Sequence, residues 1–406
     1  MLMILRTALL NLRRHAKRTL LTGSLLLVAA LVLVATDAIG AAVRQNLTDT
    51  TIFTIAGHLQ VRHRDAAADP LRPEVGQVPT LPAGAADIAR LEAVPGVAAV
   101  APRLRYGGAL VVGDRQFEAL VVGVRSDAER AATPRLRVGQ GRFLAGGDGE
   151  GIVISAKAAG DLAVGVGDAV TLFAARPDGL PVAAPLRVTG IVDTGAAGLF
   201  VDHISYVDLP RLQGLLGIDG VSEFKLLLAD GQDVGAAARA LAATLPAGQV
   251  VRTYKDLGGV VLGIAAVSDM MFELVFVILS VIAIAGVLNT MLMAVSERRR
   301  EIGVLSAIGA RPGRILALFL TEAGILALGF ALVGVAVAAG ATAVLARTGI
   351  TVGDAVPLIG AERLYPVLDA GLLFQVPLRL ALVALIGAAY PAFAASRLDP
   401  AACLRQ

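Results

Sequence analysis

The uncharged, strongly apolar segment from Leu274 to Ala294 most constrains the fold of this chain. Leu, Ile, Val and Phe dominate the segment, and at about 1.5 Å per residue a helix of this length crosses the roughly 30 Å hydrocarbon core of a membrane. Three further segments have the same character: Leu20 to Gly40, Ala323 to Ala346, and Leu380 to Ala395. The sequence therefore predicts an α-helical membrane protein with four transmembrane helices.

The distribution of charge orients these helices. Residues 1–19, 296–314 and 397–406 carry excess Arg and Lys, whereas acidic residues outnumber basic ones in residues 347–371. Basic loops stay in the cytoplasm, so both termini and residues 296–314 are expected there and residues 44–265 are expected outside. A cleavable signal peptide remains an alternative for the first segment, because small residues follow its basic and Leu-rich parts.

The composition agrees with a membrane protein that has no catalytic site of its own. A mean hydropathy of +0.73 with 56% hydrophobic residues exceeds that of ordinary globular chains. The net charge of +3 comes from basic residues at membrane edges, so we expect no nucleic acid partner. The sequence has no phosphate-binding loop of the G-x-x-x-x-G-K-[ST] kind, no G-x-S-x-G motif and no metal-ligand spacing among its His residues. We therefore expect no cofactor and no metal, and we expect ATP to be hydrolysed elsewhere.

Residues 44–265 have the pattern of an α+β extracytoplasmic domain inserted between helices 1 and 2. Short apolar or alternating runs bounded by Gly, Pro and Asp predict strands, and helices are expected near Ala85 to Ala93 and Val234 to Leu245. Each helix lies between two predicted strands, which suggests a split βαβ subdomain whose halves join in space, although two ordinary βαβ units also resemble each other by chance. A β-rich module, expected to be all-β, separates the halves at about residues 137–215.

A proline-rich loop is expected at residues 175–185 of this module. It contains Pro177, Asp178, Gly179, Leu180 and Pro181. The loop is either a solvated connection or a protrusion that contacts a partner.

Helical periodicity continues beyond the apolar segments on both sides of the inserted domain, after Asp37 and after Lys255. Both helices are therefore expected to extend outside as stalks. The predicted division of the chain is an amphipathic elbow (1–19), helix 1 (20–43), the extracytoplasmic domain (44–265), stalk and helix 2 (266–295), a coupling loop (296–314), helix 3 (315–346), a short outer loop (347–371), helix 4 (372–396) and a tail (397–406).

The coupling loop contains a short amphipathic helix from Glu297 to Ala310. Its apolar residues fall at helical spacing, charged residues surround them, and Pro312 ends the helix. Such a helix is suited to docking in a groove of a partner, and a helix lying on the membrane surface is the alternative. The predicted coupling residues are Glu297, Arg298, Arg299, Arg300, Glu301, Ile302, Leu305, Ile308 and Gly309.

Helix 3 carries two pairs of small residues four positions apart, Ala327 with Ala331 and Ala336 with Gly340. Such pairs permit close helix packing, either within one subunit or between subunits. Glu322, at the inner end of the same helix, is expected to be interfacial or paired rather than ion-translocating.

Several sequence blocks resemble one family. Residues 289–295, followed by ERRREIGVLSAIGA and FLTEA, are similar to the second span and cytoplasmic loop of FtsX-like, MacB-type ABC transporter permeases. The tail YPAFAASRLDPAACLR and the blocks GRF, GDAVTLF, RVTGIVD and VPGV resemble further parts of the same family.

The resemblance implies a permease of the bacterial inner membrane that pairs with a second permease copy or paralogue and with an ABC ATPase subunit in trans. Movement of the extracytoplasmic domain would then export or extract an amphiphile, peptide or lipoprotein, with a periplasmic adaptor or lipoprotein as a further partner. The alternative is a mechanical signalling subunit that activates an outer enzyme or sensor without transport.

Overall fold

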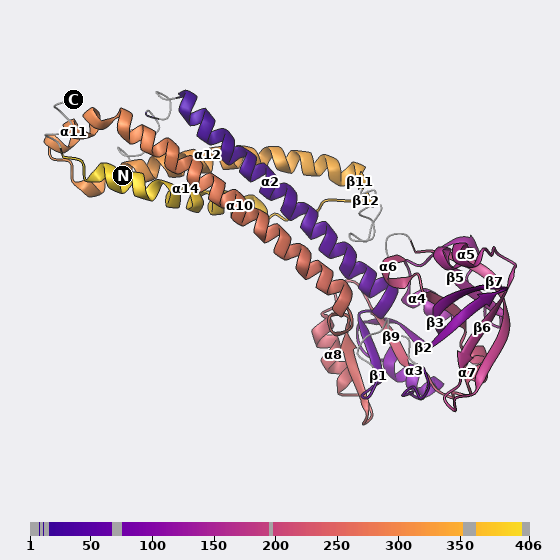
Figure 1. Cartoon of the computed structure of the whole chain (residues 1–406). Coiled ribbons are helices and arrows are strands. Elements are labelled where there is room, and N and C mark those ends of the chain that lie inside the picture. Colours follow the sequence, from indigo (N-terminus) through magenta and orange to yellow (C-terminus); the bar gives the residue numbers. More distant parts are fainter. Residues whose placement is uncertain are drawn as a thin grey trace. The chain divides into compact units, whose positions relative to one another are not determined.

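The computed structural model describes residues 8, 11, 16–66, 75–194, 198–351 and 363–399, which fall into two compact units (Figure 1). The membrane unit comprises the described residues up to Ala42, Val267–Thr351 and those from Arg363 onward. The inserted domain comprises the described residues from Val43 to Ala266. Most of the predicted elbow, the tail beyond Asp399 and residues 352–362 of the predicted outer loop lie outside the described residues.

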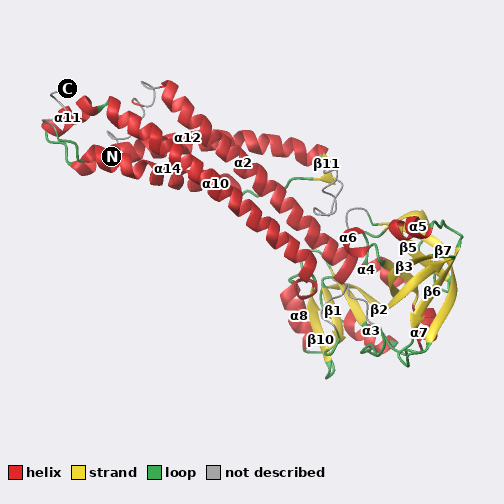
Figure 2. Ribbon diagram, in the orientation of Figure 1, coloured by secondary structure: helices red, strands yellow, loops and turns green. Residues whose placement is uncertain are grey.

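The membrane unit consists mainly of long helices (Figure 2). Four are long and apolar enough to cross a membrane: α2 (Ala16–Thr50), α10 (Gly259–Glu297), α12 (Pro312–Thr348) and α14 (Leu372–Ser396). A short helix, α11 (Arg299–Ala307), connects α10 to α12, and β11 (Ile350–Thr351) pairs with β12 (Arg363–Leu364). The predicted fold class, four membrane helices with a domain between the first two, is confirmed.

Two of the helices extend well beyond their apolar segments. Helix α2 continues to Thr50 and then into a π-helical turn, η1 (Thr51–Ala56), while α10 already begins at Gly259. The fourth helix contains Pro377 and Pro391, which membrane helices tolerate because neighbouring groups satisfy the freed carbonyls. Within the membrane unit, the Arg379 guanidinium lies 5.4 Å from the centre of the Phe276 ring.

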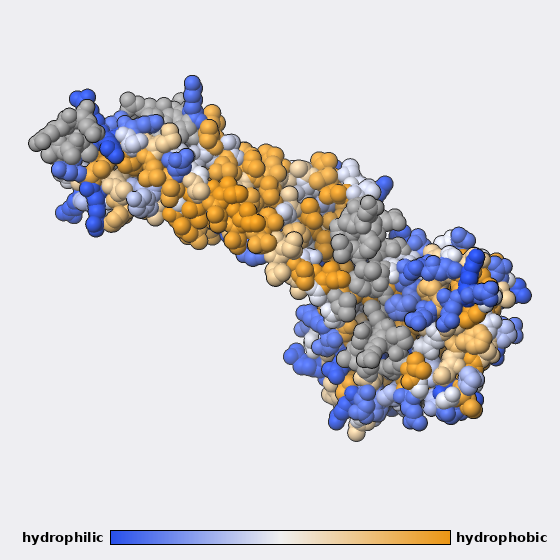
Figure 3. Space-filling view, in the orientation of Figure 1, coloured by the Kyte–Doolittle hydropathy of each residue, from blue (hydrophilic) through white to orange (hydrophobic). Residues whose placement is uncertain are grey.

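Small residues allow the membrane helices to approach closely. A Cβ atom added at Gly334 of α12 would lie 2.6 Å from the carbonyl oxygen of Leu27 on α2, and one at Gly387 of α14 would lie 2.8 Å from that of Ile284 on α10. Around these contacts the helices bury two clusters of apolar side chains. The face of the helices seen in Figure 3 is mostly apolar along their length, with hydrophilic residues near α11.

The inserted domain contains a ten-stranded sheet whose first four strands interleave two distant parts of the chain. Their order is β10-β1-β9-β2, and all neighbours are antiparallel. The strands are β1 (Leu59–His63), β2 (Val97–Val112), β9 (Glu223–Leu228) and β10 (Gln249–Thr253). Strands that precede the insertion, β1 and β2, thus alternate with strands that follow it.

The two faces of this four-stranded sheet differ in polarity, because successive side chains of a strand point to opposite faces. Leu59, Val61, Phe224 and Leu226 belong to the main apolar core together with side chains from helices α3 (Ala85–Glu92) and α8 (Val234–Ala242). The alternate positions, including Arg62, hold buried polar side chains. A short helix, α4 (Ser126–Ala132), and η1 contribute contacts to that second face.

Five further strands close into a barrel with β2, and β4 pairs with β7 outside this ring. The order β2-β3-β8-β5-β7-β6 returns to β2, because β6 pairs with both β7 and β2. The added elements are β3 (Arg115–Val124), β4 (Arg137–Gly141), β5 (Gly151–Ser155), β6 (Ala169–Ala175), β7 (Pro181–Asp193), β8 (Ile204–Asp208), and the helices α5 (Ala156–Leu162), α6 (Gly198–Val201), α7 (Leu209–Leu216) and α9 (Tyr254–Leu257).

The region predicted to be an all-β module therefore differs in two ways. It shares β2 with the four-stranded sheet, and residues 137–215 contain α5, α6 and most of α7. These helices have four to eight residues, which is too short for a helical period to be recognised beside strands.

The predicted loop at residues 175–185 is also shorter than expected. Strand β6 ends at Ala175 and β7 begins at Pro181, so the connection is a tight turn. Pro185 lies inside β7, opposite Thr171 of β6. Pairing of β7 with β5 begins only at Arg187, so the missing N–H of this proline faces an unpaired strand edge, where proline is tolerated.

Candidate functional sites in the α10–α12 turn and the inserted domain

The turn between α10 and α12 contains the residues predicted to couple the protein to a partner. The backbone N–H of Arg298 still bonds Ala294 at the end of α10, and that of Ile302 bonds Arg298 at the start of α11. Gly309 ends the segment with φ +89°, a conformation that favours glycine. Pro312 was predicted to end a helix from Glu297 to Ala310, but α11 already ends at Ala307 and Pro312 occupies the first position of α12.

The apolar residues of α11 and its C-cap residue, Ile308, do not share one face. Ile302 is 3% exposed and packs in the core of the membrane unit, whereas Val304, Leu305 and Ile308 are 45%, 37% and 76% exposed. At 3.6 residues per turn, Ile302 and Ile308 point about 120° apart, so one helix face cannot hold both. The exposed apolar surface is therefore formed by Val304, Leu305 and Ile308, of which the sequence analysis missed Val304.

The charged residues of the turn also fall into an exposed group and a buried residue. Glu297, Arg299, Arg300 and Glu301 are exposed, but Arg298 is buried. Its guanidinium donates 3.1 Å hydrogen bonds to Glu301 and to Glu322 of α12 and lies 5.3 Å from the centre of the Phe319 ring. The expectation that Glu322 is paired is thus confirmed. Arg298 ties α11 to α12 and is not available at the surface.

The two small-residue pairs of α12 have different surroundings. Ala327 and Ala331 are fully buried among neighbouring helices of the same chain. Ala336 and Gly340 are exposed, and a Cβ atom at Gly340 would meet no atom within 4 Å. Only the first pair packs within the chain, while the backbone of α2 is approached at Gly334, which was not among the predicted packing residues.

The β6–β7 turn at residues 176–180 is well ordered by its own hydrogen bonds. The backbone N–H of Arg176 bonds Leu180, that of Leu180 bonds the Asp178 carboxylate, and Gly179 has φ +84°. Leu180 is nevertheless 59% exposed at the turn. This apolar side chain is the part of the predicted partner-contact loop that a partner could bind.

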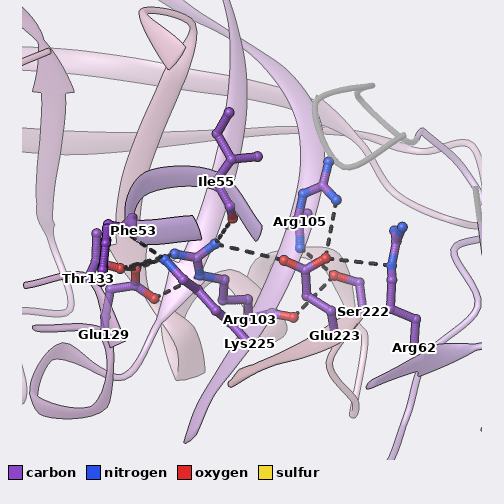
Figure 4. A network of polar contacts seen from close by, with 10 residues as sticks. All are labelled: Phe53, Ile55, Arg62, Arg103, Arg105, Glu129, Thr133, Ser222, Glu223 and Lys225. Atoms are coloured by element: carbon purple, nitrogen blue, oxygen red, sulfur yellow. Dashed lines mark hydrogen bonds and ion pairs between the residues drawn. The ribbon is translucent and has the colours of Figure 1, made fainter. Parts of the chain in front are cut away.

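A buried ion cluster in the inserted domain was not predicted. It comprises Arg62, Arg103, Arg105, Glu129, Glu223 and Lys225, all nearly inaccessible to solvent (Figure 4). The sequence pattern did not predict this cluster, because alternating charged and apolar residues in a strand ordinarily indicate one solvent-facing side. The signal was present in the pairs Gln60/Arg62, Arg103/Arg105 and Glu223/Lys225, each placing polar side chains at alternate strand positions.

Arg103 is the centre of the buried ion cluster. Its guanidinium donates two hydrogen bonds to the Glu129 carboxylate, one of them 2.8 Å long, and a third of 2.9 Å to the backbone carbonyl of Ile55 in η1. Lys225 Nζ donates to Thr133 Oγ1 at 2.9 Å and to the carbonyl of Phe53 at 3.3 Å. Glu223 accepts a hydrogen bond of 3.2 Å from Arg105 and lies 3.6 Å from Arg62 Nε.

These contacts shift the pKa values of the buried groups. Burial alone would raise the pKa of Glu129, but the charge and hydrogen bonds of Arg103 outweigh it and lower this pKa to about 2. Burial likewise opposes ionisation of Glu223, yet Arg105, Arg62 and Arg103 lower its pKa. Burial, reinforced by Arg103, lowers the pKa of Lys225 well below its ordinary value. The two carboxylates are therefore ionised at neutral pH.

The buried ion cluster has no arrangement suited to catalysis. Ser222 and Lys225 have the S-x-x-K spacing, but Ser222 Oγ bonds the Arg103 carbonyl and the Arg105 N–H while Lys225 bonds η1. Among the described residues, no group of three or more His, Cys, Asp or Glu could hold a metal ion. A hollow of about 700 Å³ on the barrel wall is lined mostly by small and apolar residues of β2, β3 and β6.

The four helices and the domain between the first two define a permease-type architecture, and comparison with known families gives the same result. Residues 19–244 match the MacB-like periplasmic core domain, and residues 273–400 match the C-terminal part of FtsX-like permeases. The chain therefore belongs to the MacB-type, FtsX-like ABC transporter permease family.

The identity of this chain to individual members of the family is low. The chain is 28% identical to the macrolide export ATP-binding/permease protein MacB 1/2 of Paracoccus denitrificans over 79% of this chain and 48% of that protein. It is 27% identical to the uncharacterized ABC transporter permease YknZ of Bacillus subtilis over 54% of each chain. The crystal structure of the periplasmic region of MacB from Actinobacillus actinomycetemcomitans is 15% identical, covering 51% of this chain and 92% of that one with a TM-score of 0.36. The chain spans about half the length, or less, of the curated relatives it matches first.

Proposed function

We propose that this permease is driven by an ABC ATPase subunit in trans that docks on α11. The observation that carries the proposal is the exposed apolar surface of Val304, Leu305 and Ile308, flanked by the exposed charges Arg299 and Arg300. A helix with such a surface is suited to binding in a groove of a partner protein.

The same geometry supports the transfer of movement into the membrane unit. Ile302 anchors α11 in the core of that unit, and Arg298 ties it to Glu322 of α12. A force applied to the exposed side of α11 therefore reaches α10 and α12 through buried contacts. In a dimer of two permease copies, this movement of the membrane helices would in turn move the inserted domain of each copy.

The proposed substrate is an amphiphile, peptide or lipoprotein that is exported or extracted from the membrane. Relatives named for macrolide export and pyoverdine export support an export role. In this proposal the inserted domain and both stalks lie outside the cytoplasmic membrane, and the termini and α11 lie inside. Leu180 in the β6–β7 turn is the proposed contact for a periplasmic adaptor or lipoprotein.

The test of coupling is recovery of the ATPase subunit with the tagged permease from detergent extracts. The double variant Leu305→Asp/Ile308→Asp places carboxylates in the docking surface, where unpaired charge is costly, so recovery should fall at least about tenfold. Arg299→Ala should reduce recovery modestly, and more at low salt than at high salt. Ile302→Asp is unsuitable as a probe because Ile302 is buried in the membrane unit. Undiminished recovery with Leu305→Asp/Ile308→Asp would show that α11 is not the docking site.

Topology is tested by labelling single cysteines in intact cells with a membrane-impermeant reagent. The only native cysteine, Cys403, is first replaced by Ser. Cysteine at Asp178, in the exposed β6–β7 turn, should react once any outer membrane has been made permeable, while cysteine at Arg299 should not. Labelling at Arg299 but not at Asp178 would show that the orientation is the reverse of the proposed one.

A further inference from the structure

The first membrane helix enters the inserted domain without a linker. Helix α2 runs into η1, Gly57 ends the helix with φ +75°, and β1 begins two residues later at Leu59. The last carbonyl groups of a helix have no partner within the helix. Here they lie in a buried setting, since Ile52, Ile55 and Ala56 of η1 are almost fully excluded from solvent.

Two buried side-chain donors, the Arg103 guanidinium and the Lys225 amine, supply the missing partners. Arg103 of β2 donates to the Ile55 carbonyl at 2.9 Å, and Lys225 of β9 donates to the Phe53 carbonyl at 3.3 Å. The C-terminal end of a helix carries partial negative charge, so cationic donors are favoured there. The two strands are direct neighbours, and Ala101 pairs with Lys225. Both donors therefore come from one side of the helix end and from adjacent strands.

These donors are themselves held in place by α4 and the residue that follows it. Glu129 accepts two hydrogen bonds from Arg103, and Thr133 Oγ1 donates to Glu129 at 2.6 Å while accepting from Lys225 at 2.9 Å. The side chains of Arg103 and Glu129 are 5% and 0% exposed. Directional bonds in a dry setting fix a geometry more strictly than apolar packing does.

We propose that Arg103 and Lys225 are positioning residues that fix the end of the first membrane helix to the four-stranded sheet. These contacts form a joint, within the inserted domain, between η1 and strands β2 and β9. That the joint transmits force from an ATPase rests on the proposed function. The existence of the joint does not, and it is tested on the permease alone.

The experiment is hydrogen–deuterium exchange on the full-length permease in lipid nanodiscs, without any ATPase. Lys225→Met removes the amine donor but keeps an unbranched side chain of similar length, and Arg103→Met/Glu129→Gln removes the second donor without leaving a buried carboxylate unpaired. The matched control is Arg105→Met, which removes a cation from the same buried ion cluster whose hydrogen bond goes to Glu223.

Amides of residues 53–58 should exchange at least about tenfold faster in both test variants, because buried charge-assisted bonds hold that segment closed. Those of β9 should keep their wild-type protection, and Arg105→Met should leave residues 53–58 unchanged. Wild-type exchange at residues 53–58 in Lys225→Met and in the double variant would overturn the proposal. So would equal loosening in Arg105→Met, which would mean that any charge removed from the cluster loosens the domain.

A distance measurement keeps the test decisive if one variant folds poorly. Spin labels at Gln45, exposed on α2, and Ala229, exposed after β9, span the joint within the inserted domain in a Cys403→Ser protein. The distance distribution should be narrow in wild type and in Arg105→Met, and broader in Lys225→Met. Equal widths in all three would overturn the proposal. Loss of ATPase recovery is measured separately on α11 variants, so either proposal can fail without the other.

Discussion

The guanidinium of Arg298 donates a 3.1 Å hydrogen bond to the carboxylate of Glu322, and both side chains are almost fully buried, at 7% and 2% exposure. The pair connects the turn before α11 to the third membrane helix. Buried pairs of this kind are costly to break from one side only, because the remaining charge loses its partner.

Arg298→Met should therefore lower the free energy of unfolding of the purified permease by about 3–5 kcal/mol, while Arg298→Met/Glu322→Gln should recover most of that loss. Thermal melting in detergent measures both. Arg299→Met, at the exposed neighbouring position, serves as the control and should change stability by less than about 0.5 kcal/mol. An Arg298→Met protein as stable as the control would contradict the buried pair.

Gly334→Ala should loosen the crossing of α2 and α12. The added methyl group would lie 2.6 Å from the Leu27 carbonyl oxygen and 2.8 Å from the Ala30 Cβ atom, and overpacking of this kind typically costs about 1–3 kcal/mol. The matched variant Gly340→Ala, on the same helix with open space around it, should cost nothing. Equal melting temperatures for the two variants would argue against the close contact.

Acid should weaken the inserted domain through Glu129. The pKa of this carboxyl is about 2 in the folded protein against an ordinary value of 4.5. A lowered carboxyl pKa contributes stability that is complete above the ordinary pKa and is lost as the pH falls from there toward the folded value. The melting temperature of the wild-type protein should thus fall more steeply below about pH 4.5 than that of Arg103→Met/Glu129→Gln. Parallel pH profiles would rule out this contribution.

Lys225 should change stability with pH in the same direction as Glu129, but at alkaline pH. Its pKa in the folded protein lies well below the ordinary 10.5 because of burial. Below 10.5 the unfolded chain binds a proton more readily than the folded one, so the contribution of this lysine to stability rises as the pH increases toward 10.5. The stability of wild type relative to Lys225→Met should increase over that range in denaturation experiments. A constant difference would mean that Lys225 titrates as in the unfolded chain.

The membrane helices could be predicted because a single physical requirement, an apolar segment long enough to cross the bilayer, determines them. The continuation of α2 beyond Asp37 and the start of α10 before Asp269 followed from helical periodicity. In contrast, periodicity alone could not show that Ile302 faces inward while Ile308 faces outward. That orientation depends on how α11 packs against the other helices.

The buried ion cluster was beyond sequence analysis for a related reason. Arg103 and Glu223 occupy alternate positions in strands whose other side chains are apolar, which is also the pattern of a sheet with one side in water. Only the placement of η1 and α4 against that side turns these charges into buried ones. Such placement depends on contacts between residues far apart in the chain.

The interleaved strand order imposes a sequence of events during synthesis. Strand β1 pairs only with β9 and β10 among the described strands, and both are made after the whole barrel. Until Lys225 has left the ribosome, the end of the first helix has only one of its two side-chain donors. Both partners of this helix end are therefore available only when synthesis is about to reach α10, the second long helix.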